Sequence, residues 1–189
     1  MRAHTTKSTH KSSNRTTQRA SPKATRTKKN ISEDVILLLT EDHKKVQKIF
    51  KDFAKSKDKM DEETKEQMVR TCCQELTVHT TVEEEIFYPA MREALGASDL
   101  MEEAAIEHDS AKQLISQLQN MRPDDERYDA TFKVLGEYVN HHIKEEQDKM
   151  FPKAKKAKLD MLSLAEEVVR RKEELLGEET DETRQGLMS

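Results

Sequence analysis

Two stretches of this sequence decide its fold: HTTVEEEIFYP at residues 79–89 and HIKEEQDKMFP at residues 142–152. Both have the pattern H-x3-E-x5-P, and side chains four residues apart lie on the same face of an α-helix. Each stretch therefore predicts a helix that has a His and a Glu on one face. Because the pattern occurs twice, we also expect the chain to contain two copies of one helical unit.

A further helix with a histidine precedes each stretch, and His43 is separated from His79 by nearly the same distance as His108 from His142. Around each histidine, apolar residues recur at steps of three and four, as in a helix that buries one face. The predicted buried faces are Ile36, Leu39, His43, Val46, Phe50 and Phe53; Met68, Cys72, Leu76, His79, Glu83 and Ile86; Met101, Ala104, His108, Ala111, Ile115 and Leu118; and Tyr128, Phe132, Leu135, Val139, His142 and Glu146. Four such helices predict an all-α, up-down four-helix bundle.

Capping and helix-breaking residues set the limits of these helices. Asp61 is the predicted N-cap of the second helix, and Pro89 and Gly96 are predicted to end it. Pro152 is predicted to close the fourth helix in the same way. We therefore expect the bundle to span residues 31–155.

The two ends of the chain differ from the bundle in composition. Residues 156–177 form a shorter amphipathic segment, which predicts a C-terminal helix with Gly177 as its C-cap, packed across the bundle or against a partner subunit. Residues 1–30 hold nine Lys or Arg, no acidic residue and no Leu, Ile, Val or Phe, so they predict a basic disordered tail rather than a transit peptide. This tail has no aromatic side chain to stack on bases, so the sequence does not favour nucleic acid as a partner. The polar, acidic residues 178–189 are predicted to be disordered.

The composition agrees with a helical protein and excludes several classes. Charged residues make up 37% of the chain and aromatic residues 4%, with only four Gly and four Pro, which favours long helices over turn-rich sheets. The mean hydropathy is -0.94, and no apolar run approaches the roughly 20 residues that cross a bilayer. The two cysteines, Cys72 and Cys73, are adjacent, which excludes a disulfide scaffold and suits the reducing cytoplasm.

The polar residues on the buried faces point to a metal site. One histidine in a core is more often a hydrogen-bonded packing residue than a ligand, but four on successive helices, two of them paired with Glu, favour metal binding. Burying these groups without partners would cost several kcal/mol, which bound cations offset. Imidazole and carboxylate groups suit iron, and also zinc or manganese. The predicted ligands are His43, His79, Glu83, His108, His142 and Glu146.

Taken together, these motifs resemble the hemerythrin-like HHE cation-binding domains over residues 31–155. The resemblance covers the His on the first and third helices, the His-x3-Glu on the second and fourth, and the helix ends Phe87 to Pro89 and Met150 to Pro152. It implies a centre of two iron ions with a bridging oxide or hydroxide. If both carboxylates bridge, each iron keeps about one position open for dioxygen, nitric oxide or peroxide.

The sequence also departs from the oxygen-carrying members of that family. They have a further His four residues after the third-helix His, where this chain has Lys112, and an Asp where it has Gln147. We therefore expect a protein that binds or senses dioxygen, nitric oxide or redox state rather than one that stores oxygen. The alternatives are a di-iron oxidase or peroxidase-type enzyme, and a metal reservoir or helical interaction module.

Two acidic residues are candidates for orienting the ligand histidines from outside. Glu75 lies one helical turn before His79, and Glu107 adjoins His108. Cys72 and Cys73 are interpreted as small core residues rather than as a redox sensor. The sequence makes no prediction about the oligomeric state.

Overall fold

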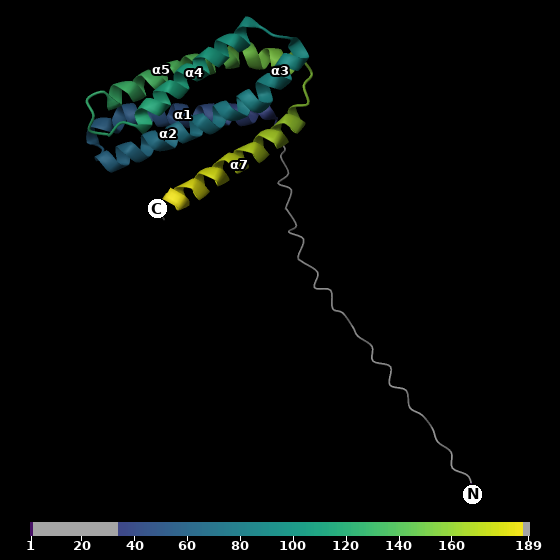
Figure 1. Ribbon diagram of the computed structural model, residues 1–189. Coiled ribbons are helices and arrows are strands. Elements are labelled where there is room, and N and C mark those ends of the chain that lie inside the picture. The colour runs from purple at the N-terminus through teal and green to yellow at the C-terminus, as the bar shows by residue number, and fades with distance from the viewer. Residues whose placement is uncertain (2–33, 187–189) are drawn as a thin grey trace. The chain divides into compact units, whose positions relative to one another are not determined.

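The computed structural model describes Met1 and residues 34–186, with side chains for residues 34–177 in this range. Four long helices form the bundle: α1 (Val35–Ser56), α2 (Glu62–Val82), α4 (Asp99–Gln119) and α5 (Tyr128–Glu145). Successive helices run in opposite directions, and α1 packs on α2 and α5 while α4 packs on α5 and α2 (Figure 1). The predicted all-α, up-down bundle is confirmed. The predicted basic tail at residues 1–30 falls outside the described residues, Met1 excepted.

Short elements extend or join the long helices. A 3₁₀ turn, η1 (Lys57–Lys59), follows α1, and the π-helical turn η2 (Glu83–Phe87) joins α2 to α3 (Tyr88–Leu95). A second π-helical turn, η3 (Glu146–Met150), joins α5 to α6 (Phe151–Lys156), and α7 (Met161–Gly186) follows. The two halves of the chain therefore repeat one arrangement, in which a long helix, a π turn and a short helix follow one another.

The predicted buried faces form a core in two apolar clusters. Apart from Phe50 and Met68, which are partly buried, all the predicted stripe residues are buried. One cluster contains Leu39, Val82 and Ala104, and the other contains Val46, Leu76 and Ala111. Since His43, His79 and His108 each lie between members of the two clusters in sequence, a polar layer separates the apolar clusters.

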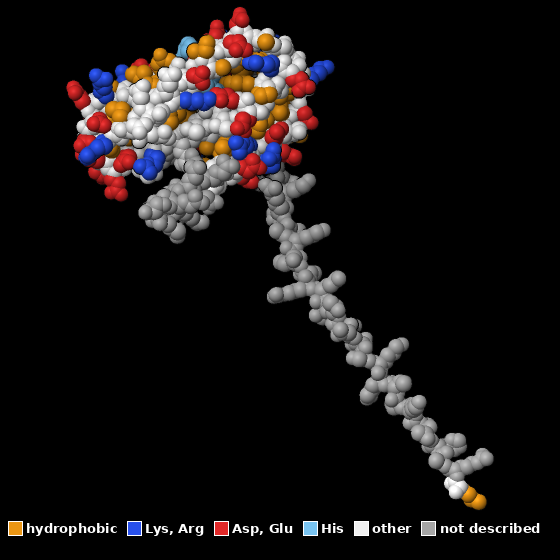
Figure 2. Space-filling model, in the orientation of Figure 1, with side chains coloured by type: hydrophobic (Ala, Val, Ile, Leu, Met, Phe, Trp, Pro, Cys, Tyr) orange, Lys and Arg blue, Asp and Glu red, His pale blue; other side chains and the backbone are white. Residues whose placement is uncertain are grey.

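Charged side chains are frequent on the visible face of the bundle, where apolar side chains are also exposed. Figure 2 shows Lys and Arg side chains intermixed with Asp and Glu over the visible face. Such amphipathic helices bury one stripe and leave the opposite face to water. Among the described residues, no helix is long and apolar enough to cross a membrane.

The predicted N-cap of α2 is confirmed, since the Asp61 side chain accepts a hydrogen bond of 2.7 Å from the Thr64 backbone N–H. Asp34 caps α1 in the same way, at 2.9 Å from the Leu37 N–H. Gly96 follows Leu95 with a φ of 79°, a conformation that costs a glycine little, and it ends the helix as expected.

The prediction that Pro89 and Pro152 end their helices is wrong. Each proline is the second residue of a short helix that continues after a π turn, α3 and α6 respectively. In these turns the Tyr88 N–H bonds to the Glu83 carbonyl, five residues back, and the Phe151 N–H bonds to the Glu146 carbonyl. The wider turn starts a new helical segment, and a proline in the first turn of a helix needs no N–H partner.

The C-terminal helix is longer than predicted. α7 runs through Gly177, the expected C-cap, and its backbone is helical to Gly186, which corrects the prediction of disorder from residue 178 for that stretch. Glycine within a helix costs only about 1 kcal/mol, too little to stop a helix by itself. α7 packs along α1 and α2, with Ala165 and Val168 fully buried. Of the two packing modes expected, it therefore adopts the one across the bundle.

Candidate metal centre

The six predicted ligands meet in the polar layer of the core. Their exposed fractions range from 0% to 7%, so all six are buried. The described residues form two buried groups whose donor atoms lie within 4.8 Å of one another, and Glu83 belongs to both. The groups are His43, His79, Glu83 and Glu146, and Glu83, His108 and His142.

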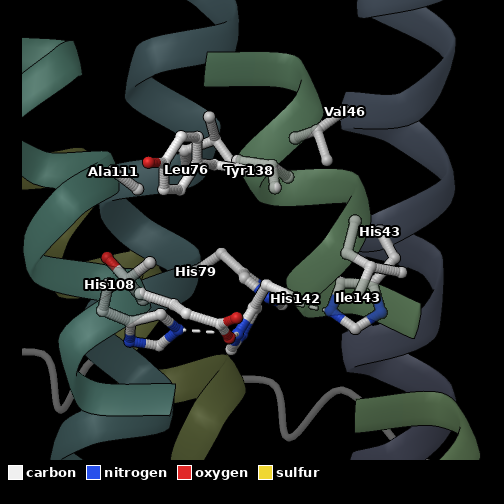
Figure 3. A pocket seen from close by; sticks show the side chains of 12 residues that line it. His43, Val46, Leu76, His79, His108, Ala111, Tyr138, His142 and Ile143 are labelled. Atoms are coloured by element: carbon white, nitrogen blue, oxygen red, sulfur yellow. Dashed lines mark hydrogen bonds and ion pairs between the residues drawn. The ribbon is translucent and has the colours of Figure 1, made fainter. Parts of the chain in front are cut away.

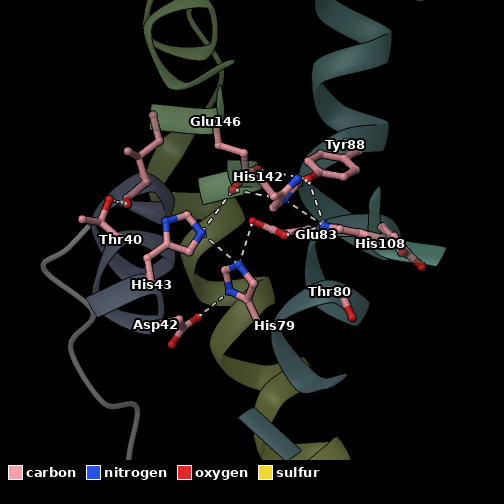
Figure 4. A network of polar contacts seen from close by, with 12 residues as sticks. Thr40, Asp42, His43, His79, Thr80, Glu83, Tyr88, His108, His142 and Glu146 are labelled. Carbon is pink, nitrogen blue, oxygen red and sulfur yellow. Dashed lines mark hydrogen bonds and ion pairs between the residues drawn. The ribbon is translucent and has the colours of Figure 1, made fainter. Parts of the chain in front are cut away.

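The four histidines are arranged as two pairs with their Nε2 atoms facing each other (Figure 4). The Nε2 atoms of His43 and His79 are 3.0 Å apart. Those of His108 and His142 are also 3.0 Å apart. Each pair joins two neighbouring helices of one half of the chain, α1 with α2 and α4 with α5.

The two carboxylates connect the histidine pairs. Glu83 Oε1 lies 3.2 Å from His79 Nε2, and its Oε2 lies 3.5 Å from His108 Nε2. Glu146 Oε2 lies 3.1 Å from His43 Nε2 and 3.6 Å from His142 Nε2. Each carboxylate therefore reaches one histidine of each pair, as a ligand shared by two cations would.

Three of the four carboxylate oxygens have no hydrogen-bond partner within the described structure: both of Glu83, and Oε2 of Glu146. Buried polar atoms without partners are costly, and ionised carboxylates especially so. Carboxylate oxygens and imidazole lone pairs that converge in this way suit divalent or trivalent metal ions. The residues present therefore fit a pair of cations.

The other ring nitrogens of the histidines are held by residues around the site. The His79 Nδ1 lies 3.1 Å from Asp42, and the Nδ1 atoms of His108 and His142 each lie 2.9 Å from a carboxylate, of Glu84 and of Glu107 respectively. A carboxylate only accepts, so these Nδ1 atoms donate and leave the Nε2 lone pairs free to bind a metal. The His43 Nδ1 lies 3.4 Å from the Gln147 amide nitrogen.

Of the two sequence candidates for such partners, Glu107 is confirmed and Glu75 is not. Glu75 bonds to Lys45 instead of to a ligand histidine, and Glu107 holds His142 rather than its neighbour His108. A signal for the true partners was present: an acidic residue directly precedes the histidine at 42–43 and again at 107–108. In both cases the acidic side chain serves the histidine of the adjacent helix.

Burial and charge control protonation in the site. Burial lowers the pKa of His79 to about 4, and it also lowers the pKa of His108. Burial acts in the same direction on His142, but the hydrogen bond to Glu107 outweighs it and raises the pKa. Burial and the neighbouring Glu146 carboxylate raise the pKa of Glu83 well above its usual range. The lowered pKa values of His79 and His108 favour neutral imidazoles with a lone pair for a metal, and a positive ion would offset the cost of ionising Glu83 in the core.

Tyr88 is a residue of the site that sequence reasoning recognised only as part of a helix end. Its hydroxyl donates a 3.0 Å hydrogen bond to Glu146 Oε1 and lies 3.4 Å from the Nε2 atoms of both His108 and His142. Burial raises the pKa of Tyr88 well above its ordinary value, so the phenol stays protonated. The site thus contains a buried proton donor beside the second histidine pair.

A small cavity of about 20 Å³ adjoins the histidines (Figure 3). All four line it, together with apolar side chains from the bundle core, among them Val46, Leu76, Ala111, Val139 and Ile143. This volume accommodates about one water-sized molecule. The cavity therefore leaves a small space next to the four histidines, walled in part by apolar side chains.

Other titratable groups near the centre do not enter it. Cys72 and Cys73 lie in the apolar cluster with Leu76, as expected for core residues. His141 is exposed at the surface, 3.5 Å from Glu107, and with Glu145 these residues form a third cluster of potential ligand atoms. Surface clusters of this kind are common without a bound ion, so the buried groups remain the candidate site.

Both the sequence and the fold of this chain resemble known proteins. Residues 34–154 match the family model of the hemerythrin HHE cation-binding domain. A DNA nickase from Nostoc sp. (strain PCC 7120 / SAG 25.82 / UTEX 2576) is 27% identical over 119 residues, which are 63% of this chain but only 32% of the nickase. A crystal structure of a hemerythrin HHE cation-binding domain-containing protein from Mycobacterium kansasii has a TM-score of 0.67 at 20% identity, covering 80% of this chain and 93% of that one. That likeness shows a shared fold.

Proposed function

Because this chain belongs to the hemerythrin HHE cation-binding family, we propose that it is a non-haem di-iron protein that binds dioxygen or nitric oxide and senses these ligands or the redox state. One observation carries the proposal. Within each of two histidine pairs the Nε2 atoms lie 3.0 Å apart, and the two unpartnered oxygens of Glu83 each approach one of the pairs. This donor set fits two cations that share carboxylates.

The proposed ligands divide evenly between two iron ions. His43 and His79 would hold one ion, His108 and His142 the other, and Glu83 and Glu146 would be shared, with a bridging oxide or hydroxide. Zinc or manganese would suit much the same ligands. When bound, the irons supply redox chemistry and open coordination positions for a small ligand.

The chain's own residues select that ligand. The cavity of about 20 Å³ beside the histidines leaves room for a small molecule only, and the apolar side chains in its wall favour an uncharged one. Asp42, Glu84 and Glu107 fix the ring orientation of three histidines. These features support a neutral diatomic ligand rather than a larger substrate.

A second candidate, a di-iron oxidase or peroxidase-type enzyme, is favoured by Tyr88. Its hydroxyl lies 3.4 Å from two ligand nitrogens and could donate a hydrogen bond to a substrate such as peroxide in place of the bond to Glu146. We do not propose DNA as a substrate. The segment that matches this chain is only 32% of the nickase, so the match does not cover most of that protein.

The test begins with metal-free protein loaded with ferrous iron under anaerobic conditions. We expect two irons per chain and a change in near-ultraviolet and visible absorption on exposure to nitric oxide or dioxygen, reversed when the gas is removed. His79→Ala should lose iron, whereas His141→Ala, which changes an exposed histidine next to a ligand, should not. Irreversible oxidation together with steady peroxide consumption would favour the enzyme over the binding protein. A loaded protein that holds no stoichiometric iron would refute both candidate functions.

A further inference from the structure

The C-terminal helix reaches the metal centre from outside the matched domain. The family match ends at residue 154, and α7 begins at Met161. The Lys172 ammonium of α7 donates a hydrogen bond to Asp42 Oδ2. The same oxygen accepts from His79 Nδ1 at 3.1 Å. A residue of α7 is therefore connected to a proposed iron ligand through a single carboxylate.

The docking of α7 places Lys172 in this position. Ala165 and Val168 are fully buried in the apolar cluster of α1, α2 and their neighbours. Arg171 makes two hydrogen bonds to Glu85, at 2.6 and 3.1 Å, and Glu85 belongs to the π turn that Glu83 begins. α7 is therefore held against the bundle by apolar packing and by a bidentate ion pair with Glu85. Figure 1 shows its ribbon running alongside α2.

The other half of the bundle contains an equivalent chain of contacts. Lys112 bonds to both oxygens of Glu84, at 2.7 and 2.6 Å, and Glu84 Oε1 lies 2.9 Å from His108 Nδ1. In that half the lysine comes from α4, within the bundle, and its side chain is 43% exposed. Lys172 is 20% exposed and comes from a separate helix. In both halves a lysine therefore contacts the carboxylate that holds a ligand histidine. On the His108 side this lysine belongs to the four-helix bundle, and on the His79 side it comes from α7.

We propose that Lys172 is a positioning residue for His79, acting through Asp42, so that retention of the iron held by His43 and His79 depends on the docked α7. The lysine fixes the Asp42 carboxylate, and the carboxylate fixes the ring and leaves Nε2 free for the metal. Without the lysine, the partly exposed Asp42 side chain is free to turn toward water. This inference rests on the proposed function.

The experiment measures how fast ferrous iron leaves the full-length loaded protein when a ferrous chelator is added in excess under anaerobic conditions. In Lys172→Met we expect one of the two irons to leave about 10-fold faster than in the unchanged protein, the lower end of the cost of losing a direct outer partner of a ligand, because Asp42 itself remains. The second iron should leave at the unchanged rate. Lys172→Arg, which keeps a cationic donor, should restore slow release of both.

Matched variants separate this role from general loosening. Lys45→Met removes another lysine that bonds to an acidic residue of α2, Glu75, and should release iron as the unchanged protein does. Lys112→Met should accelerate the other iron, so the double variant with Lys172→Met should release both quickly. Asp42→Asn should accelerate the same iron as Lys172→Met, and combining the two should add nothing further.

Equal acceleration of both irons in Lys172→Met, or no acceleration, overturns the inference while leaving the di-iron proposal intact. A full additional effect of Lys172→Met in the Asp42→Asn background overturns it as well. Circular dichroism of each variant checks that α7 and the bundle remain folded. If the unchanged protein holds no iron, the proposed function itself fails, which is a distinct result.

Discussion

Glu83 and Glu146 are each the first residue of a π-helical turn, and both turns are followed by a proline in the first turn of the next short helix. The wider turns therefore occur at the two carboxylates that reach both histidine pairs. π turns inserted in α-helices are frequent at functional sites. In this chain each π turn begins at a carboxylate proposed to bridge two metals, and it alters which residues after that carboxylate face the core.

Replacing Glu83 should have opposite effects with and without metal. In metal-free protein both oxygens of Glu83 are buried without a partner, a situation that costs about 1–3 kcal/mol or more for each such group. Glu83→Leu should therefore raise the free energy of unfolding of the metal-free protein by about 1–3 kcal/mol. The same variant should fail to hold two irons. Urea unfolding and metal analysis measure the two effects, and a destabilised metal-free variant would contradict this account.

The advantage of Glu83→Leu should grow with pH. Burial and Glu146 raise the pKa of Glu83, so above about pH 4.3 the unfolded chain loses a proton that the native state keeps. The free energy of unfolding of the unchanged, metal-free protein is therefore not reduced by Glu83 ionisation at low pH, and it falls as the pH rises toward the raised pKa of Glu83. The difference in unfolding free energy between the variant and the unchanged protein should be larger at pH 8 than at pH 4.5. A difference independent of pH would show that Glu83 has an ordinary pKa.

Removing the metal should lower the melting temperature. Each ion that binds only the native state at a free concentration of about 100 times Kd adds about 2.7 kcal/mol to the free energy of unfolding. For a domain of this size that corresponds to roughly 5–11 °C. Calorimetry of iron-loaded and chelator-treated protein tests this expectation. Identical melting temperatures would mean that the native state has no preference for the ion.

Filling the cavity should impair ligand binding without loss of metal. Ala111 lines the cavity, and Ala111→Val adds two methyl groups there. A ligand must then displace packed atoms at about 1–3 kcal/mol, so its affinity should fall roughly 5- to 150-fold. Ala104→Val makes the same change on the same helix in the other apolar cluster, and should leave the affinity for nitric oxide unchanged. Equal losses in both variants would indicate general overpacking.

Tyr88 should contribute to the stability of the metal-free core. Tyr88→Phe removes the hydroxyl that donates to Glu146 Oε1 and leaves this buried oxygen without a hydrogen bond. The free energy of unfolding should fall by about 1–3 kcal/mol. Tyr138→Phe is the control, because the Tyr138 side chain is 49% exposed and its loss should change stability little. Similar unfolding curves for the two variants would contradict the role of the buried hydrogen bond.

The two cysteines should be unreactive in the native protein. Burial raises the pKa of Cys73 to about 12 and that of Cys72 well above its usual range, so neither forms the nucleophilic thiolate near neutral pH. Ellman's reagent at pH 8 should modify neither residue until denaturant unfolds the chain, and then both. Rapid reaction in the folded state would reopen the interpretation of this pair as a redox sensor.

The sequence by itself determined the helices and which side of each faces inward. Steps of three and four residues identified Leu39, His43 and Val46 as one buried stripe, and the repeated His-x3-Glu pattern placed two donor groups on each of two helices. These inferences succeed because they depend only on the geometry of a single helix. The six polar residues were predicted to lie at one level of the core because they occupy equivalent positions in the two halves of the chain.

Only the tertiary structure decided what surrounds that set. The pairing of Asp42 with His79, the approach of Tyr88 to Glu146, and the contact of Lys172 with Asp42 all join different helices. Helical periodicity fixes the inward face of one helix but not its rotation and axial shift against its neighbours, which depend on how all the side chains pack together. The continuation of the chain as helix past Pro152 and Gly177 could not be predicted from these residues alone, because a proline in the first turn of a new helix costs little and a glycine within a helix costs only about 1 kcal/mol.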